Sequence, residues 1–235
     1  MSKVLIEANN LIKVYGQGEG KTRALDDVSL KIYQGELLVI LGSSGSGKST
    51  LLNMIGGMDH PDSGEILSGG ENICEYSDKQ LTDYRRVKSS FVFQSFNLIQ
   101  ELTARENIAL VAEGDDGKEN VVEALEVVGL LDKADHYPSQ LSGGEQQRIS
   151  IARALVKKSH IMLCDEPTGA LDYETGKQIL VKLEELSRRY GKTVVIVTHT
   201  REIADIADRV IRMRNGKIIE ERINENPRSA AAVEW

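Results

Sequence analysis

The sequence predicts an α/β fold with a β-rich N-terminal region and a helical insertion. Apolar runs of strand length alternate with segments of helical pattern, and these runs cover residues 37–41, 90–93, 161–166 and 193–198. Near the N-terminus, residues 3–35 indicate β-structure, because Val28, Leu30 and Ile32 alternate with polar neighbours. Residues 97–157 are mainly helical by pattern and interrupt the strand–helix alternation. We therefore interpret residues 97–157 as an inserted helical subdomain.

Composition limits the classes of protein. A chain of 235 residues with 40% hydrophobic and 28% charged residues is long enough for one large or two small soluble domains. A net charge of −7 argues against non-specific nucleic-acid binding, which depends on neutralising phosphates. No apolar run has the length of a membrane span and no signal-peptide pattern is present, so we expect a cytoplasmic protein. Cys74 and Cys164 have no metal-site spacing and are expected to be free thiols.

A glycine-rich segment between the apolar run 37–41 and a helical pattern has the complete Walker A form. Its glycines let backbone N–H groups approach a polyphosphate, and the following helix adds the positive end of its dipole. Lys48 is expected to reach the β- and γ-phosphates, and the Ser49 hydroxyl to bind Mg²⁺. The alternative interpretation is a flexible glycine–serine turn. The Lys-Ser pair at the Walker A spacing argues strongly against it. The nucleotide-binding segment is Gly42, Ser43, Ser44, Gly45, Ser46, Gly47, Lys48, Ser49 and Thr50.

Two further residues gain meaning only beside this motif. Tyr15 precedes the glycine-rich connection 16–22 and offers a flat face on which an adenine can stack. Gln94 follows the apolar run 90–93, at the strand end where ligands bind in open parallel sheets. By themselves, Tyr15 would be interpreted as a packing residue and Gln94 as a solvent-facing side chain.

A second candidate anion site lies at residues 142–145. Ser142 and Glu145 have the spacing of a capping box, and Gly143 and Gly144 expose backbone N–H groups at the start of a helix. The simpler interpretation is a well-capped helix. The same geometry also predicts that a nucleotide is held from two sides.

The strand-like run 161–166 ends in two carboxylates. Asp165 fits the Walker B role of holding Mg²⁺, and Glu166 is placed to orient or deprotonate an attacking water. His199 follows the last apolar run and is predicted to stabilise the transferred phosphoryl group. The alternatives are two carboxylates that cap the next helix and a structural or surface histidine.

The C-terminal part gives two local predictions. Asn215-Gly216 between two strand-like runs is typical of a β-hairpin turn. Residues 221–235 carry no periodic pattern and are expected to form a weakly ordered tail.

Taken together, these segments resemble the ATP-binding subunit of ABC transporters, over about residues 3–220. The resemblance implies a single nucleotide-binding domain over residues 1–235, with a P-loop NTPase core of RecA-like fold. It also implies an antiparallel β subdomain and the helical subdomain at 97–157. ATP and Mg²⁺ are the cofactors that it implies, and the chain is expected to be an ATP hydrolase.

The resemblance also gives roles to residues. Tyr15 matches the adenine-stacking position, and Gln94 matches the loop that senses the γ-phosphate and Mg²⁺. Ser142, Gly143, Gly144 and Glu145 match the signature that binds ATP across a head-to-tail dimer of two copies. The remaining matches are Asp172, which communicates across that dimer, Glu166 as catalytic glutamate and His199 as switch histidine.

Weaker marks resemble the macrolide-export, lipoprotein-release and antimicrobial-peptide-resistance group. These are the loop after Tyr15, residues 53–59, 93–98 and 167–172. They imply an integral-membrane permease as partner, a location on the inner face of the membrane through that permease, and export or mechanotransmission. Two alternatives stay open: an ATPase switch of a cell-division membrane complex, and a soluble ATPase acting on ribosomes or DNA.

Overall fold

The computed structural model describes residues 3–112 and 117–234 and contains two β-sheets. The first sheet has the strand order β2-β1-β4-β5, and each neighbouring pair is antiparallel. Alternating buried and exposed residues in β2 explain why one face of this sheet is apolar. Its strands are β1 (Val4–Tyr15), β2 (Thr22–Tyr33), β4 (Ser63–Ser68) and β5 (Glu71–Asn72).

The second sheet has the order β10-β9-β3-β8-β7-β6, and it is parallel except for β10, which pairs antiparallel with β9. Its central strands are buried on both faces, as their continuous apolar sequences require. The predicted α/β class is therefore confirmed. The strands are β3 (Leu37–Leu41), β6 (Ser89–Val92), β7 (Ile161–Asp165), β8 (Thr193–Thr198), β9 (Arg209–Arg214) and β10 (Lys217–Ile223).

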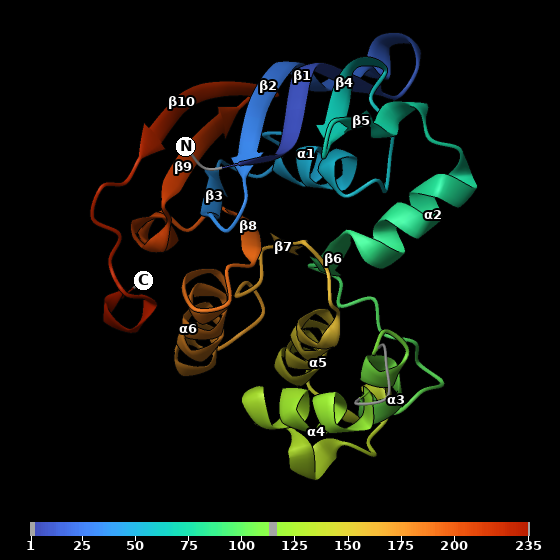
Figure 1. Cartoon of the computed structure of the whole chain (residues 1–235), viewed down its shortest axis with the longest axis vertical. Coiled ribbons are helices and arrows are strands. Elements are labelled where there is room, and N and C mark those ends of the chain that lie inside the picture. The colour runs from blue at the N-terminus through green and yellow to red at the C-terminus, as the bar shows by residue number, and fades with distance from the viewer. Residues whose placement is uncertain (1–2, 113–116, 235) are drawn as a thin grey trace.

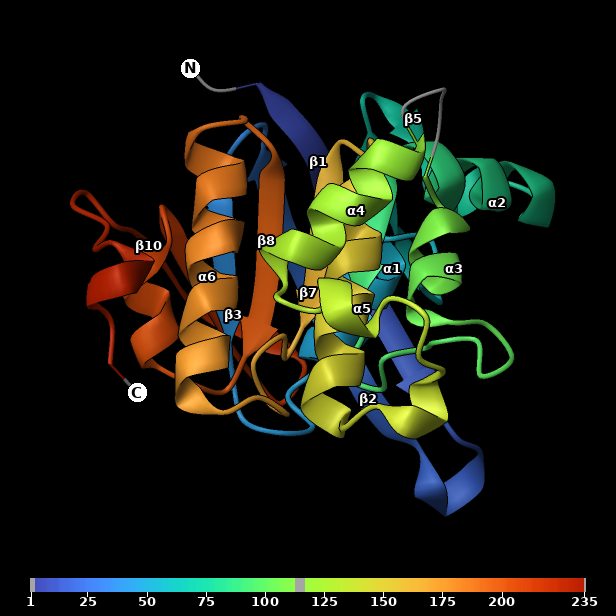
Figure 2. The same ribbon diagram turned by 90° about the horizontal axis from the view of Figure 1, so that it is seen from below.

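Figure 1 shows the layers: the antiparallel sheet, then α1, then the six-stranded sheet, then α5 and α6, with α3 and α4 beyond α5. Figure 2 shows α4, α5 and α6 in front of the strands, and the connection between β1 and β2 projecting at one end. The α-helices are α1 (Lys48–Ile55), α2 (Asp78–Val87), α3 (Ala104–Ala109), α4 (Gly117–Val127), α5 (Gly143–Val156) and α6 (Tyr173–Arg188). The 3-10 turns among the described residues are η1 (Gly18–Gly20), η2 (Ile73–Glu75), η3 (Leu131–Lys133), η4 (Pro138–Gln140), η5 (Glu202–Ile206) and η6 (Ala230–Ala232).

The six-stranded sheet separates two apolar cores. Leu38 and Ile40 of β3 face α1 and the antiparallel sheet, whereas Leu37, Val39 and Leu41 face the helices on the other side. Since successive side chains of a strand point to opposite faces, one strand contributes to both cores. The phosphate loop at the end of β3 therefore starts from a strand that is fixed on both sides.

Residues 97–112 and 117–157 contain α3, α4, α5, η3 and η4, and no β-strand among them. Helices α3 and α4 pack on α5, and α5 packs on β6, so α5 joins the helical segment to the sheet. The predicted capping box at Ser142 forms at the start of α5, and a second capping box forms at Thr103 for α3.

The C-terminal segment differs from the weakly ordered tail that we expected for residues 221–235. Strand β10 continues to Ile223, and the segment then packs against α6. Ala230 and Val233 are 0% and 1% exposed and belong to the helical-side core. Two small apolar side chains in an irregular segment give no periodic signal, which is why the pattern missed them.

Smaller predictions are confirmed. Asn215 and Gly216 both have positive φ, 51° and 76°, as a two-residue hairpin turn requires. Cys74 and Cys164 are free thiols, and burial raises the pKa of Cys164 far above its ordinary value. Among the described residues, no helix has both the length and the apolar character of a membrane span.

Candidate functional site

The phosphate loop turns sharply between β3 and α1. Gly47 is the N-cap of α1 and has a φ of 100°, a backbone angle that residues other than glycine rarely adopt. A Cβ on Gly47 would lie 2.3 Å from the carbonyl oxygen of Ala24, and one on Gly42 would lie 2.3 Å from Ser46 Oγ. The loop conformation therefore depends on glycine at both positions.

Lys48 is held inside this loop. Its Nζ donates hydrogen bonds to the carbonyl oxygens of Gly42 (2.9 Å) and Ser43 (3.1 Å), and the residue is only 6% exposed. A lysine with three donors has capacity for a further acceptor, so this geometry presents a positive charge to an anion in the loop.

A cavity of about 430 Å³ opens in front of the loop. It brings together the four predicted catalytic residues, which are far apart in sequence: Lys48, Gln94, Glu166 and His199. Asp165, Gly42, Ser43 and Tyr15 lie outside its lining. The lining residues are Thr22, Ala24, Ser44, Gly45, Ser46, Gly47, Lys48, Ser49, Thr50, Gln94, Glu166, Gly169 and His199.

Asp165 lies behind the cavity at the end of β7. Its Oδ1 atom is buried without a hydrogen-bond partner among the described residues. Burial raises the pKa of Asp165, while a hydrogen bond with the Ser49 hydroxyl opposes this shift. An unpaired carboxylate oxygen beside a serine hydroxyl is the oxygen-donor arrangement that Mg²⁺ prefers.

Glu166 is strained and tightly held. Its φ is 47°, in the left-handed region, and its N–H donates to the carbonyl of Val197 (3.0 Å). Thr198 Oγ1 donates to Glu166 Oε2 (3.0 Å), and His199 Nδ1 lies 2.9 Å from Oε1. Both carboxylate oxygens are thus fixed by the end of β8. We did not foresee Thr198 from the sequence, because a buried hydroxyl inside an apolar run gave no signal.

The loop after Gln94 is fastened to α5. Phe96 and Asn97 both have positive φ, 61° and 49°, and their carbonyl oxygens accept hydrogen bonds from Arg153 at 3.0 Å and 2.6 Å. Burial lowers the pKa of Arg153. A single guanidinium of α5 therefore holds the backbone two and three residues after the cavity residue Gln94.

Tyr15 lies at the end of β1 and is 43% exposed. Its hydroxyl donates to Asp59 Oδ2 (2.9 Å), and Lys13 forms an ion pair with the same carboxyl (2.9 Å). Burial raises the pKa of Tyr15, and the bond to Asp59 adds to the shift. Burial of Asp59 is outweighed by its hydrogen bonds to Lys13 and Tyr15, which lower its pKa. The Tyr15 hydroxyl also interacts with the side chain of Thr50, at the end of the nucleotide-binding segment, so these contacts fix the ring next to that segment.

The segment 142–145 lies apart from the cavity, because none of its residues lines it. Ser142 Oγ accepts from the N–H of Glu145 (3.3 Å), and Glu145 Oε2 accepts from the N–H of Ser142 (2.8 Å). Glu145 also pairs with Lys133, and these bonds lower the pKa of Glu145 to about 2. A Cβ on Gly143 or Gly144 would meet its nearest atoms at 3.8 Å and 3.5 Å, which is ordinary contact.

Asp172 begins α6 as its N-cap. Its Oδ1 accepts from the N–H of Thr175 (3.0 Å), and the hydrogen bonds with Thr175 lower the pKa of Asp172. Asp172 is exposed, so the structure gives it a capping role and leaves its surface free.

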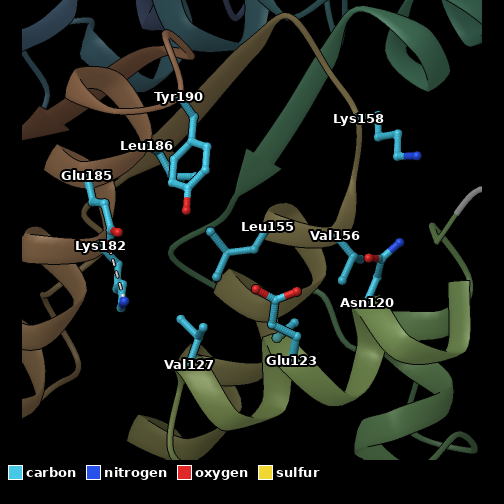
Figure 3. A pocket seen from close by; sticks show the side chains of 11 residues that line it. Asn120, Glu123, Val127, Leu155, Val156, Lys158, Lys182, Glu185, Leu186 and Tyr190 are labelled. Atoms are coloured by element: carbon cyan, nitrogen blue, oxygen red, sulfur yellow. Dashed lines mark hydrogen bonds and ion pairs between the residues drawn. The ribbon is translucent and has the colours of Figure 1, made fainter. Parts of the chain in front are cut away.

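A separate hollow of about 300 Å³ lies between α4, α5 and α6 (Figure 3). Val127, Leu155 and Leu186 line it, and the Glu123 carboxylate and Tyr190 hydroxyl point into it (Figure 3). None of the residues predicted for the nucleotide site lies there. The cavity in front of the phosphate loop is therefore the candidate active site.

A buried strand, a glycine loop around a lysine and an adjacent pair of carboxylates define a nucleoside-triphosphate site. Comparison with known proteins agrees with this class. Residues 25–169 match the family model described as ABC transporter. The chain belongs to the ABC transporter family, and is an ATP-binding and ATP-hydrolysing cassette.

Individual relatives extend the comparison. The macrolide export ATP-binding/permease protein of Pasteurella multocida is 43% identical over all of this chain, which spans 37% of that relative's length. An ABC transporter ATP-binding protein of Methanocaldococcus jannaschii is 43% identical over 92% of this chain and 98% of its own length. A dimeric structure of the cassette MJ0796 bound to ADP and Pi has a TM-score of 0.88 and 42% identity, and covers 93% of this chain and 98% of its own.

Proposed function

We propose that two copies of this chain bind two ATP molecules between them, head to tail, and hydrolyse them to drive a membrane permease. The main support for the dimer is the difference between the glycines of the phosphate loop and those of the segment 142–145. Gly42 and Gly47 are required by contacts within the chain, whereas a side chain on Gly143 or Gly144 would fit. Open backbone N–H groups at the start of α5 are therefore available to a phosphate that comes from outside the chain.

Hydrolysis is assigned to the residues of the cavity. Lys48 supplies positive charge to the phosphates, and the loop N–H groups orient them. Glu166 Oε1, held beside His199, orients the attacking water and accepts its proton. His199 then faces the oxygen atoms where negative charge increases. Gln94 lines the same cavity and senses the γ-phosphate.

Mg²⁺ is the metal that we propose for this site. The residues present fit it: the unpaired Oδ1 of buried Asp165 and the neighbouring Ser49 hydroxyl are hard oxygen donors. Gln94 adds an amide oxygen from the facing loop. When bound, Mg²⁺ neutralises phosphate charge and fixes its orientation.

Adenine recognition is assigned to Tyr15. Its exposed ring is held next to the phosphate loop by the hydrogen bond to Asp59 and the contact with Thr50. Stacking on an adenine therefore costs little further conformational entropy. Asp172 and Glu145 complete the composite site. Glu145 fixes the backbone of Ser142, and the exposed Asp172 is assigned to the contact with the partner copy.

A permease is the proposed partner, and export or mechanotransmission is the proposed activity. The relatives named for macrolide export contain a permease in the same chain, and this chain spans slightly more than a third of their length. A surface cavity of about 300 Å³ lined by Met58, Phe93 and Leu110 lies next to Asn97 and Arg153. Because Arg153 holds the loop after Gln94, a permease helix seated there would sense the nucleotide cavity.

This partner would place the chain on the inner face of a membrane, through contact rather than through a span of its own. The relatives reported above are named for export or as ATP-binding proteins, so the cell-division switch is not proposed. Purification of tagged protein from native membranes with ATP tests the partner. A permease that co-purifies supports the proposal, and recovery of soluble proteins alone contradicts it.

Substitution Glu166→Gln tests the reaction. It keeps the shape of the site but removes the proton acceptor, so turnover is expected to fall by at least about 100-fold while ATP affinity is retained. The matched control is Glu126→Gln, an exposed glutamate of α4. Phosphate production and equilibrium binding of ATP are the measurements. Normal turnover in Glu166→Gln would overturn the assignment.

A further inference from the structure

A second cavity adjoins the nucleotide cavity. It has a volume of about 590 Å³ and lies between the start of the phosphate loop, η5 and the β9–β10 hairpin. Gly42 and Ser43 line it on one side, and His199 lines both cavities. The imidazole that faces the nucleotide cavity is therefore also part of the wall of this second cavity.

The lining of this second cavity is strongly basic although the chain has a net charge of −7. Four arginines contribute to it: Arg201, Arg212, Arg214 and Arg222. The two carboxylates that line it, Asp205 and Glu220, are already paired with Arg228 (3.4 Å) and Arg212 (2.7 Å). The negative charges therefore do not neutralise the other arginines.

Three guanidinium groups remain available. Arg201, Arg214 and Arg222 are exposed, and their side chains make no ion pair or hydrogen bond with the described part of the chain. Arg214 and Arg222 project from the two strands of one hairpin, and Arg201 follows β8 two residues after His199. A guanidinium is weakly hydrated and has five donors in a fork that matches a phosphate.

We propose that this arginine cavity binds inorganic phosphate, and that it receives the phosphate product as it leaves the active site. The proposal rests on the proposed function for the source of the phosphate. Hydrolysis leaves the phosphate next to His199, which also lines the adjoining cavity, and that cavity carries the unpaired positive charges of Arg201, Arg214 and Arg222. Moving toward them separates the phosphate from the negatively charged ADP, so the reverse reaction is disfavoured.

The test fills the nucleotide cavity first. Protein saturated with a nonhydrolysable ATP analogue and Mg²⁺ is titrated with inorganic phosphate in a calorimeter, so the γ-phosphate position is already occupied. The triple variant Arg201→Gln/Arg214→Gln/Arg222→Gln is compared with Lys79→Gln/Arg105→Gln/Arg189→Gln. That control removes the same charge from three cations outside the cavity: exposed Lys79 of α2, half-buried Arg105 of α3 and exposed Arg189, the C-cap of α6.

The parent and the control are expected to bind one phosphate per chain with the same Kd, and the arginine triple variant to bind at least about tenfold more weakly. Equal phosphate affinity in all three proteins, or no phosphate binding by the parent, would overturn the proposal. Binding of the same three proteins to vesicles of phosphatidylglycerol is measured in parallel. If the arginine triple variant loses binding to the vesicles but keeps the parent's affinity for phosphate, the cavity binds lipid headgroups and the proposal is overturned. Failure of the analogue to bind would contradict the proposed function, and phosphate would then be titrated without it.

Discussion

The phosphate loop and the segment 142–145 both place glycines at the start of a helix, but for different reasons. In the phosphate loop, Gly47 has a φ of 100° and a Cβ there would collide with the backbone of Ala24. At the start of α5, a Cβ on Gly144 would lie 3.5 Å from the nearest atom, the carbonyl oxygen of Ala170. The first glycine is explained by the fold of one chain. The second is not required by contacts within the chain, and the proposed nucleotide of a partner copy would explain it.

Substitution Gly47→Ala should have the largest effect of this comparison. The left-handed backbone alone costs about 1–3 kcal/mol, and the clash with Ala24 displaces the loop. We expect a lower free energy of unfolding together with loss of ATP binding. Urea unfolding and nucleotide titration measure both, with Gly20→Ala as the control because a Cβ there meets no atom within 4 Å. Unchanged stability and ATP affinity in Gly47→Ala would show that the fold does not require glycine at this position, and the difference from Gly144 would not hold.

Substitution Gly144→Ala should separate folding from function. The added methyl group fits within the chain, and alanine is a better helix residue than glycine, so the free energy of unfolding should not fall. Turnover is expected to fall by at least about tenfold, because the methyl group occupies the approach to the backbone N–H groups. Unfolding and steady-state hydrolysis are measured on the same preparation. A variant with full turnover would show that this face is not used.

The sequence indicated the elements around these glycines better than it indicated their contacts. The Walker A loop, the capping box at Ser142 and the hairpin at Asn215 depend on neighbours within a few residues, so the pattern predicted them. In contrast, the hydrogen bond from Arg153 to the carbonyl oxygen of Asn97 joins residues that are 56 positions apart. Such tertiary bonds leave no local periodicity. The single-domain boundaries and the roles of the site residues stay predictions.

Substitution Thr198→Val should have a smaller effect, which concerns catalysis and not the glycines of either segment. Thr198→Val removes the hydroxyl that donates to Glu166 Oε2 and leaves the N–H of Thr200 without its acceptor. We expect kcat to fall between about 10-fold and 100-fold with little change in KM, because Glu166 is misplaced. Thr198→Ser keeps the hydroxyl and should restore most of the turnover. Equal kcat in the valine and serine variants would contradict this positioning role.

The smallest expected effect concerns the acid stability of the segment 142–145. Because the folded state lowers the pKa of Glu145 to about 2 from 4.5, its stabilisation is present above pH 4.5 and is lost as the pH falls toward 2. Lys133→Met removes the main cause, so the pKa of Glu145 should rise and this acid dependence should become weaker. Urea unfolding at pH 7 and pH 3 measures the difference. An identical pH dependence in the variant would contradict the assigned ion pair.

The central claim is that each nucleotide is shared between the phosphate loop of one copy and the segment 142–145 of the other. Mixing two variants of low activity, Lys48→Ala and Gly144→Ala, tests it most directly. In a head-to-tail dimer, the intact phosphate loop of the Gly144→Ala chain meets the intact segment of the Lys48→Ala chain, and one complete site forms. The account predicts that the mixture hydrolyses ATP well above either variant measured separately. Activity no greater than the sum of the two would contradict it.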